Sequence, residues 1–366
     1  FLYQSTWSLG GTGYQFGRNH DGSSYGGVLE DRTGNMAVTW EKANKYNAGI
    51  DLEMFGNALS ISGDAFYELR SDILATPGTI PSMIGITNLP YVNLGKVQNK
   101  GFELTMEYRK NYRKYGYFLK ANFSYNVNRI MAMDEPSFDG HTYQRHTGRA
   151  IDDQYGYVAL GLFQSQDDIN KSPDQSSFGA VQPGDLKYKD MNGDGVVNSL
   201  DQTYLGKRSV PYKIAGIALG GNFHSFDVSM LFQGGFGGHT WFTGPRMWPF
   251  SGDAGVLSDI KDNYWTPDHT NAKYPRLSYA ANQNNDQNSS WWLYNSNYLR
   301  LKNLEIGYTL PNATSRLVGI RNLRLFVNGL NLITWDKIKI FDPETPNDSG
   351  NYPQMRVYNA GLTVGL

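Results

Sequence analysis

Oxygen-bearing side chains alternate along the segment DMNGDGVVNSLD, which runs from Asp190 to Asp201. Hard oxygen ligands at alternate positions suit Ca²⁺, and a central glycine permits the tight curl that turns such ligands inward. The last position holds Asp instead of the longer Glu and no helical pattern flanks the segment, so an Asn/Gly/Asp turn without an ion is the alternative. The predicted calcium ligands are Asp190, Asn192, Asp194, Val196 through its carbonyl oxygen, and Asp201, with Asn198 as a further oxygen donor.

Aromatic side chains gather in one long connection between predicted strands. Aromatic faces stack on sugar rings and on peptide side chains, and loops of this kind often carry function. The alternative is that these rings pack the loop onto its neighbours. We expect packing for most of them and ligand contact for one or two. The candidate ligand-binding residues are Trp241, Phe242, Trp248, Phe250, Trp265, Trp291 and Trp292.

No arrangement of residues requires catalysis. The stretch Gly22 to Gly26 matches the G-x-S-x-G string of hydrolases, but it lacks the strand-turn-helix context that a nucleophile there needs. The 6 His residues show no metal-ligand spacing, and the absence of Cys excludes disulfides and thiol nucleophiles. The net charge of -1 gives no support to nucleic-acid binding. We therefore expect neither an enzyme nor a nucleic-acid-binding protein.

The elements that position these residues are predicted to be β-strands. Between Gly101 and Ile130, apolar and polar residues alternate in two arms, and period two indicates a strand with one apolar face. Each arm is about as long as a strand tilted across a bilayer, roughly 9 to 11 residues. The apolar face meets either a soluble core or lipid. It comprises Phe102, Leu104, Met106 and Tyr108, then Tyr117, Leu119, Ala121, Phe123, Tyr125 and Val127, whereas Glu103, Glu107, Arg109, Lys120 and Asn122 lie on the polar face.

The same alternation predicts about ten strands in the whole chain. The first covers about Trp7 to Phe16 and is followed by a loop from Gly17 to Asn35. In the segment YLRLKNLEIGYTLP the apolar positions change from odd to even numbers, which predicts a bulge near Lys302 and Asn303. Further apolar faces are predicted at Tyr46, Ala48, Ile50, Leu52 and Met54; Leu59, Ile61, Gly63, Ala65 and Tyr67; Tyr212, Ile214, Gly216, Ala218 and Gly220; Phe226, Val228, Met230 and Phe232; and Tyr358, Ala360, Leu362 and Val364.

Short and long connections alternate between the predicted strands. A tight turn at Gly56 is followed by a connection from Arg70 to Asn99, and later short turns alternate with long segments at 131–210 and 234–297. Outer-membrane barrels place short turns on the periplasmic side and long loops outside, whereas a soluble sandwich has no reason to sort loops in this way. The sequence therefore favours an all-β transmembrane antiparallel β-barrel, with 131–210 and 234–297 as long extracellular loops.

Several segments, in order from about Thr39 to the end, resemble the C-terminal barrel of the SusC/RagA family of TonB-linked outer-membrane transporters of Bacteroidota. The matching segments are TWEKANKYNAGIDLEMFGNALSISGDAFYELRSDIL, LGKVQNKGFELTMEYR, YGYVALGLFQSQDDI, PGDLKYKDMNGDGVV, NYWTPDHTNAKYPRL, NYLRLKNLEIGYTLP and LRLFVNGLNLITW.

The resemblance implies a plugged outer-membrane barrel of about 22 strands. Such a barrel imports glycans or peptides with energy passed on by TonB, beneath a SusD-like lipoprotein lid. Residues 1–366 would then be the C-terminal part of one barrel domain, and the plug and the N-terminal strands would belong to polypeptide outside this chain. Leu366 stands where many outer-membrane proteins end in an aromatic residue, so we expect the chain to stop a residue short.

Two other functions stay open at this point. A passive porin-like barrel would share the strand pattern but would need no TonB. A secreted β-rich glycan-binding or adhesin module would share the loop aromatics but would dissolve in water without detergent.

Overall fold

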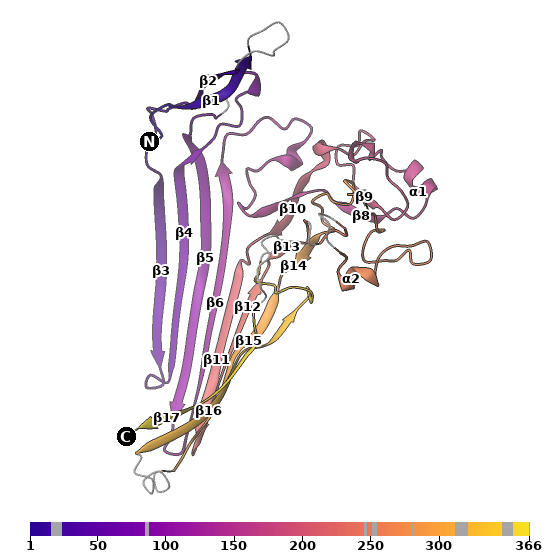
Figure 1. Cartoon of the computed structure of the whole chain (residues 1–366). Coiled ribbons are helices and arrows are strands. Elements are labelled where there is room, and N and C mark those ends of the chain that lie inside the picture. The colour runs from indigo at the N-terminus through magenta and orange to yellow at the C-terminus, as the bar shows by residue number, and fades with distance from the viewer. Residues whose placement is uncertain are drawn as a thin grey trace. The chain divides into compact units, whose positions relative to one another are not determined.

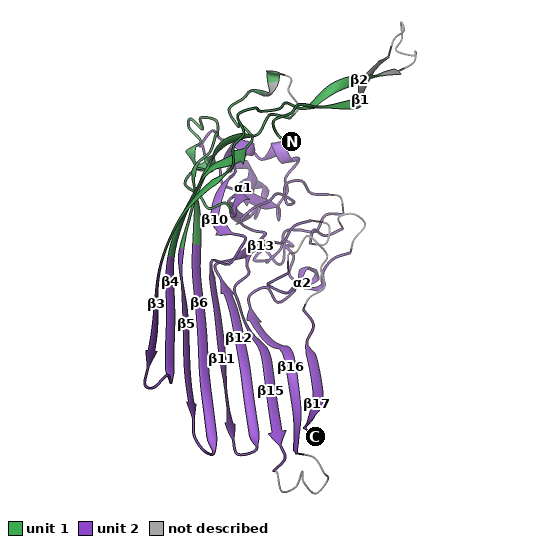
Figure 2. Cartoon of the chain, turned by 90° about the vertical axis from the view of Figure 1, so that its left-hand side faces the viewer, with its two compact units in different colours: residues 1–47, 66–100, 127–151 green, residues 48–65, 101–126, 152–366 purple. Residues whose placement is uncertain are grey.

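The computed structural model describes residues 1–15, 24–84, 88–244, 247–250, 255–279, 281–311, 321–345 and 354–365. Leu366 and the first residues of the G-x-S-x-G string lie outside this part of the chain. The chain divides into two compact units, which Figure 2 distinguishes by colour. Unit 1 comprises residues 1–47, 66–100 and 127–151, and unit 2 comprises residues 48–65, 101–126 and 152–366.

A nine-stranded sheet is the main element, with the strand order β17-β16-β15-β12-β11-β6-β5-β4-β3 (Figure 1). Each strand pairs with its neighbours in the up-and-down order that hairpins produce. The strands are β3 (Lys42–Met54), β4 (Leu59–Ala75), β5 (Val92–Asn111), β6 (Tyr115–Ala132), β11 (Lys213–Phe223), β12 (Phe226–Phe236), β15 (Tyr298–Thr309), β16 (Asn322–Asp336) and β17 (Val357–Gly365).

Unit 1 contains a separate hairpin of β1 (Thr6–Gln15) and β2 (Ser24–Arg32). The predicted first strand is confirmed, but the prediction of a loop from Gly17 to Asn35 is wrong for the β2 residues. The reason is that the pattern Tyr25, Val28, Leu29 does not alternate, and the bulges in the pairing with β1 absorb this irregularity. The first strand therefore belongs to this hairpin and not to the main sheet.

Side-chain hydrogen bonds join the connections of unit 1. The Asn93 Nδ2 group donates to the Thr39 carbonyl at 2.9 Å, and the Thr79 hydroxyl donates to Asp134 at 2.8 Å. β4 and β5 are longer than predicted, so the connection between them covers only residues 76–91 instead of Arg70 to Asn99. Two 3₁₀ turns, η1 (Ser82–Ile84) and η2 (Thr142–Gln144), complete the unit.

Unit 2 carries short elements in its long connections. They form the two-stranded sheets β7–β10, β8–β9 and β13–β14. The elements are β7 (Asp153–Gly156), β8 (Ala159–Leu162), α1 (Gln166–Asn170), η3 (Ser176–Phe178), β9 (Leu186–Tyr188), η4 (Ser199–Asp201), β10 (Thr203–Arg208), β13 (His239–Trp241), α2 (Ser258–Lys261) and β14 (Leu293–Asn295). No described helix is long and apolar enough to cross a membrane.

The two faces predicted for β5 and β6 are confirmed. On one face the Phe102 ring lies 5.7 Å from the Phe123 ring, and the Tyr108 ring lies 6.0 Å from the Tyr117 ring. On the other face Glu107 accepts from Arg109 at 3.1 Å and lies 3.7 Å from the Lys120 Nζ atom, and Ser124 contacts Glu103. Asn122 lies on this face too, because it covers Gly216 of β11. All five polar residues are exposed or half-buried, so none of them faces a dry core.

The apolar face predicted for β11 is wrong. Ile217 pairs with Ala121 of β6 and Phe232 of β12, so the odd-numbered residues of β11 share the apolar face with these neighbours. Of the predicted set, Ile214, Gly216, Ala218 and Gly220 therefore belong to the opposite face, whereas Tyr212 precedes β11 and its ring lies 6.0 Å from that of Tyr125. Ala215, Ile217, Leu219 and Phe223 make the odd-numbered face of β11 the more apolar one, since the even-numbered face carries only Ile214 and Ala218 beside two Gly residues and Asn222. The strand's own residues therefore agree with the parity that the neighbouring strands impose.

The predicted bulge in β15 is confirmed. The register with both neighbouring strands shifts between Leu301 and Asn303. As a result Leu299 and Leu301 lie on the same face as Leu304 and Ile306, opposite apolar residues of β16. The bulge keeps one face of β15 continuously apolar.

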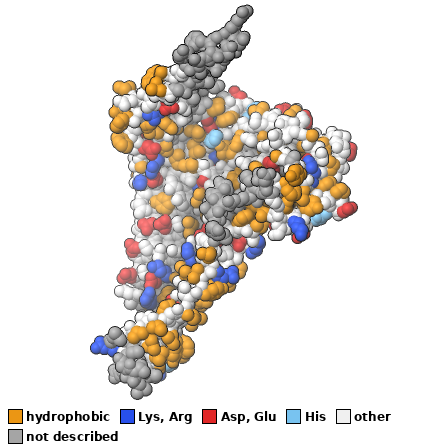
Figure 3. Space-filling model, viewed as in Figure 1, with side chains coloured by type: hydrophobic (Ala, Val, Ile, Leu, Met, Phe, Trp, Pro, Cys, Tyr) orange, Lys and Arg blue, Asp and Glu red, His pale blue; other side chains and the backbone are white. Residues whose placement is uncertain are grey.

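The apolar face of the sheet is exposed in this structure. Ile50, Val327 and Leu362 are each more than half exposed. Among the described residues the only buried apolar side chains on strands of the main sheet are Tyr298 and Leu301. Charged side chains are interspersed along the strands at the left of Figure 3. A sheet with so much apolar surface on one face and charges on the other requires an apolar surrounding on the first face.

We predict that Val327→Lys destabilises the full-length barrel by about 2–4 kcal/mol, because it places a charge on the face directed at hydrocarbon. Asn359→Lys in the neighbouring strand is the matched control, since Asn359 hydrogen-bonds Asn328 on the polar face, and it should change stability by less than about 1 kcal/mol. The measurement is urea unfolding of the barrel in lipid vesicles. Equal effects of the two substitutions would contradict the assignment of the faces.

A candidate functional site in the loop core

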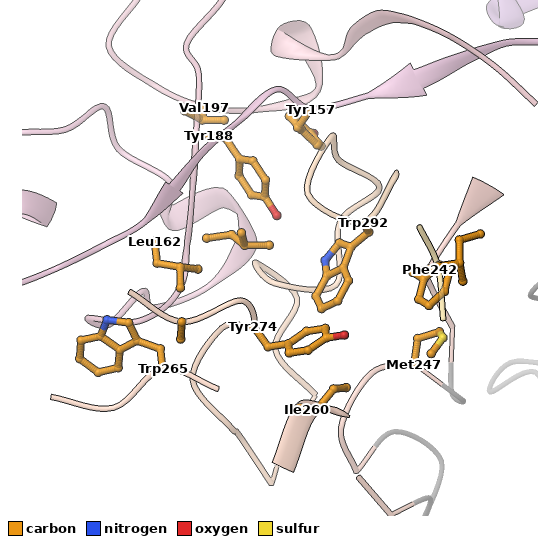
Figure 4. Packing of buried hydrophobic residues seen from close by; sticks show 13 residues of the cluster. Tyr157, Leu162, Tyr188, Val197, Phe242, Met247, Ile260, Trp265, Tyr274 and Trp292 are labelled. Atoms are coloured by element: carbon orange, nitrogen blue, oxygen red, sulfur yellow. The ribbon is translucent and has the colours of Figure 1, made fainter. Parts of the chain in front are cut away.

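The long connections of unit 2 share one hydrophobic core, which we call the loop core. It is built from residues that are far apart in the sequence, and Tyr157, Tyr188 and Phe242 in it are at most 2% exposed. In Figure 4 Trp292 and Tyr274 occupy the centre, with Trp265 on one side and Phe242 with Met247 on the other. The buried members are Tyr157, Leu162, Leu186, Tyr188, Val197, Phe242, Met247, Ile260, Trp265, Ala272, Tyr274, Trp292 and Ile338.

Three of the predicted ligand-binding aromatics are buried members of the loop core. Phe242 is 1% exposed and its ring lies 4.3 Å from that of Tyr294. Trp292 is 2% exposed, and its indole N–H donates to the Asn285 carbonyl at 2.7 Å. Trp265 is 7% exposed. In this conformation the three rings pack against protein, and a role in ligand binding stays a prediction for them.

The other four predicted aromatics are half-buried, and three of them, Trp241, Trp248 and Trp291, pack at the edge of the loop core. Trp241 in β13 donates its indole N–H to the Gln154 side chain. Trp248 and Trp291 pack against the core from outside. Phe250 has a φ of 59°, and its ring lies 5.8 Å from Tyr279. These four side chains keep surface that a ligand could contact.

A buried carboxylate holds together three segments of the loop core. Asp185 is fully buried; its Oδ2 atom accepts from Arg276 Nη2 at 3.3 Å, and its Oδ1 atom lies 2.8 Å from Arg276 Nε in an ion pair. The same oxygen accepts from the side-chain amides of Asn282 and Asn285, both at 2.9 Å, while Oδ2 accepts from the Gln182 N–H at 2.8 Å. A buried charge is stable only with a full set of partners, and this one has them.

A second buried polar network lies beside the first. The Gln175 side-chain amide donates to the Leu186 carbonyl at 3.0 Å and to Asn284 Oδ1 at 2.7 Å. The Tyr188 hydroxyl donates to the Asn284 carbonyl at 2.6 Å, and burial raises the pKa of this hydroxyl. The sequence analysis missed Gln175, Asp185 and Asn284, because the contacts that join them to distant segments span 91 to 109 residues and no spacing marks them.

A cleft opens at the edge of these networks. It offers apolar surface from Trp292 and Tyr274 and polar atoms from Arg276, Asn282 and Asp286. Burial raises the pKa of Asp286 to about 6, against a smaller opposing effect of the Asn282 backbone. The cleft can therefore hold a small polar or cationic group against aromatic surface.

The predicted calcium loop is closed by its own hydrogen bonds. Asp190 accepts from the N–H groups of Gly193 and Gly195, which have φ values of 77° and 85°. Burial alone would raise the pKa of Asp190, but these and neighbouring backbone hydrogen bonds lower it. Asn192 and Asp194 likewise accept from N–H groups of the loop.

Asp201 is fully buried and accepts from the Met191 and Asn198 N–H groups, so its carboxylate is used within the loop. Val196 donates its N–H to Asp194. In the described part of the chain, no three His, Asp or Glu side chains come together as a metal site would need. The turn alternative thus accounts for every contact of the loop, and a calcium ion there stays a prediction.

One further buried charge joins a loop to the sheet. Arg300 in β15 is 1% exposed; it donates to Asp342 at 2.7 Å, to Thr334 Oγ1 at 3.0 Å and to Glu344. The Tyr298 hydroxyl also donates to Glu344, at 2.5 Å. The segment after β16 is therefore fixed against the polar face of the sheet.

A sheet with one apolar and one charged face, extended by long connections with their own core, defines a portion of a transmembrane β-barrel. The family model described as TonB dependent receptor-like, beta-barrel matches residues 3–332. The chain therefore belongs to the TonB-dependent receptor-like β-barrel family, which is a family of receptors and transporters and not of enzymes.

Relatives from Bacteroidota are similar to this sequence over most of its length. TonB-dependent receptor P3 of Formosa agariphila is 28% identical over 92% of this chain and 35% of its own length. TonB-dependent receptor SusC of Bacteroides thetaiotaomicron is 21% identical over 94% of this chain and 34% of its own length. The chain thus spans about a third of the length of these curated relatives, and the resemblance to SusC/RagA-type proteins is confirmed.

The solved structure of the RagAB peptide transporter has the same fold. It superposes with a TM-score of 0.70 at 21% identity and covers 100% of this chain and 39% of its own. The "open-open" state of the RagAB peptide importer gives the same TM-score of 0.70. The fold prediction of a barrel portion is therefore confirmed.

We predict that Asp185→Asn destabilises the loop core by about 2–4 kcal/mol, because it leaves Arg276 without its charge partner and turns an amide N–H₂ group toward other donors. Hydrogen exchange of the loop-core amides in the full-length protein measures this change. Asp167→Asn is the control, since its ion pair with Lys171 is exposed, and it should change stability by less than about 1 kcal/mol. Similar exchange rates in both variants would contradict the role of Asp185.

We predict that stability of the loop core falls as the pH rises from about 4 to 6. The pKa of Asp286 is about 6 in the folded protein and near its ordinary value of about 3.9 in the unfolded chain, so the folded state binds more protons in this window. Asp286→Asn removes this dependence and should stabilise the loop core by about 1 kcal/mol at pH 7.5, a figure reduced for partial exposure. Hydrogen exchange at pH 5 and pH 7.5 tests it, and an unchanged pH profile in the variant would contradict the assignment.

Proposed function

We propose that this chain is the C-terminal part of an outer-membrane transporter barrel that imports its substrate with energy delivered through TonB. The observation that carries the proposal is the family match over residues 3–332 on a sheet whose outer face is apolar and whose inner face is charged. The N-terminal strands, the plug and the contact with TonB would be supplied by the rest of a longer chain. A SusD-like lipoprotein lid would be its partner at the cell surface.

In this proposal the two parts of unit 2 do different work. The strands form a wall, because each is paired with its neighbours in one nine-stranded sheet and the bulge in β15 keeps its apolar face continuous. The loop core forms a second rigid body whose position on the long-connection side suits contact with the substrate. Its half-buried aromatics Trp241, Trp248 and Trp291, the half-buried Phe250 and the cleft beside Asp286 are the surfaces that would meet the substrate.

The substrate class we propose is a glycan, an oligosaccharide or a peptide. Half-buried tryptophan faces suit sugar rings and peptide side chains equally, and the combination of Asp286, Arg276 and two Asn side chains can bind hydroxyl or amide groups. The RagAB structures belong to a peptide transporter, but a likeness at 21% identity supports only the fold. A mixture of both substrate classes should therefore be offered in the first uptake assays.

We predict that uptake by cells carrying the full-length protein stops when the proton-motive force is dissipated and when TonB is deleted. The physical reason is that a plugged barrel has no open aqueous path, so it needs work from the inner membrane. Radiolabelled substrate retained after filtration measures uptake. A strain with a general porin and no copy of this protein is the control for membrane damage.

Uptake that persists without TonB would support the passive porin-like alternative. Recovery of the full-length protein in the soluble fraction without detergent would contradict both barrel functions and support a secreted β-rich module. The exposed apolar face makes that recovery unexpected.

A further inference from the structure

A groove lies on the apolar face of the sheet near the short turns. It is formed where two rows of paired residues cross β6, β11, β12 and β15. The row nearest the turns is entirely aromatic and consists of Tyr115, Phe223, Phe226 and Tyr308. The next row consists of Tyr117, Gly221, Val228 and Ile306. All of these residues except Tyr308 line the groove, together with Gly116, Asn222 and Asp227.

The groove exists because Gly221 contributes no side chain to the second row. Its neighbours across the strands are Tyr117 and Val228, so a gap one residue wide remains between larger groups. An added Cβ atom at Gly221 would lie 2.5 Å from the Gly116 carbonyl oxygen, which shows how closely the two backbones approach here. An apolar channel bordered by aromatic side chains results, and an apolar surface of this kind can take up a hydrocarbon chain.

Basic residues lie in the turns at this end of the groove. Arg113 and Lys114 are exposed in the turn between β5 and β6, and His224 lies in the turn between β11 and β12. The two turns are adjacent, because the His224 N–H donates to the Lys114 carbonyl at 3.0 Å. Lys110 shares the face of Tyr108, since side chains two apart in a strand point the same way.

These cations are available to an external anion. In the part of the chain that the structure describes, no carboxylate forms an ion pair with Lys110, Arg113 or Lys114. Asp227, the acidic residue among those that line the groove, forms an ion pair with Arg324. A phosphate group at the rim would therefore meet uncompensated positive charge, and each cation near an anionic headgroup contributes about 1 kcal/mol.

We propose that the groove and its cationic rim bind one anionic phospholipid of the periplasmic leaflet. An acyl chain occupies the channel beside Gly221 between the aromatic side chains, and the headgroup phosphate lies at Lys110, Arg113 and Lys114. The short turns mark the periplasmic end of an outer-membrane barrel, which assigns the leaflet. The inference rests on the outer-membrane location in the proposed function, but it does not depend on TonB or on the substrate.

The test uses the full-length protein purified in detergent, stripped of lipid and then offered phosphatidylglycerol or phosphatidylcholine. Native mass spectrometry counts the lipids retained. We expect one phosphatidylglycerol to be retained and at least about tenfold less phosphatidylcholine. Millimolar inorganic phosphate should not displace the lipid, because the acyl chain supplies much of the affinity. Displacement by phosphate would show an anion site without a chain site and would overturn the proposal.

Two variants separate the parts of the site. The triple variant Lys110→Gln, Arg113→Gln, Lys114→Gln should lower phosphatidylglycerol retention at least about tenfold. The control Lys171→Gln, Lys207→Gln, Lys261→Gln makes the same change in net charge at exposed positions of the loops and should leave retention unchanged. Val228→Trp fills the channel and should lower retention of both lipids. Equal losses in the two triple variants would overturn the proposal, since they would reveal only general charge attraction.

The outcome is separable from that of the proposed function. If uptake depends on TonB but no variant alters lipid retention, the lipid site alone is wrong. If lipid retention follows the expected order but uptake is independent of TonB, the transport mechanism is wrong and the site stands. Correct folding of each variant is checked by heat-modifiable mobility, that is, by the difference in electrophoretic mobility between unheated and boiled samples.

Discussion

Backbone pairing is the constraint on which the rest of this structure depends. In hydrocarbon each unpaired N–H or C=O group costs several kcal/mol, so a strand can cross a membrane only with partners on both sides. In the nine-stranded sheet seven strands have a paired strand on both sides, whereas β3 and β17 each have one unpaired edge within the sheet. In a membrane both edges must meet further strands, which agrees with a chain that spans about a third of its relatives. Irregular backbone within the sheet is confined to a few places, such as the bulge in β15 and the positive φ values of Asp72 in β4 and Asn331 in β16.

The constraint also divides the chain into regions with different stabilising interactions. The apolar face of the sheet is directed at its surroundings, and the sheet buries almost no apolar side chains of its own. The long connections cannot rely on lipid, so they bury tryptophan, tyrosine and leucine side chains against one another. Because such loops also carry many backbone polar groups, their core needs side-chain partners such as Asp185, Gln175 and Asn284. A polar network inside a loop core is therefore a consequence of loop length.

Period-two patterns predicted the parts of the fold in which one face is clearly apolar. The hairpin of β5 and β6 and the bulge near Asn303 follow from alternation alone, because large apolar and charged residues leave one consistent register. The face of β11 is less distinct, since Ile214 and Ala218 lie opposite Ile217 and Leu219, and three Gly residues add no apolar side chain to either face. The aromatic side chains of the loops were recognised, but their burial depends on contacts with segments as distant as Tyr157 and Ile338. Asp185 and Asn284 had no local signal at all.

Glycine has opposite consequences in the two regions, and this explains where function can develop. On the polar face Gly307 lets the Arg324 guanidinium lie across β15, where it pairs with Asp227 and Glu305 and so fixes three strands together. On the apolar face Gly221 leaves a gap that no neighbouring side chain fills. A gap directed at lipid costs little, because an acyl chain can occupy it, whereas a gap in the loop core would cost packing energy. Concave surface can therefore accumulate on the outside of the sheet without loss of stability, while a substrate site in the loops must be built at the edge of an already packed core, as the cleft beside Asp286 is.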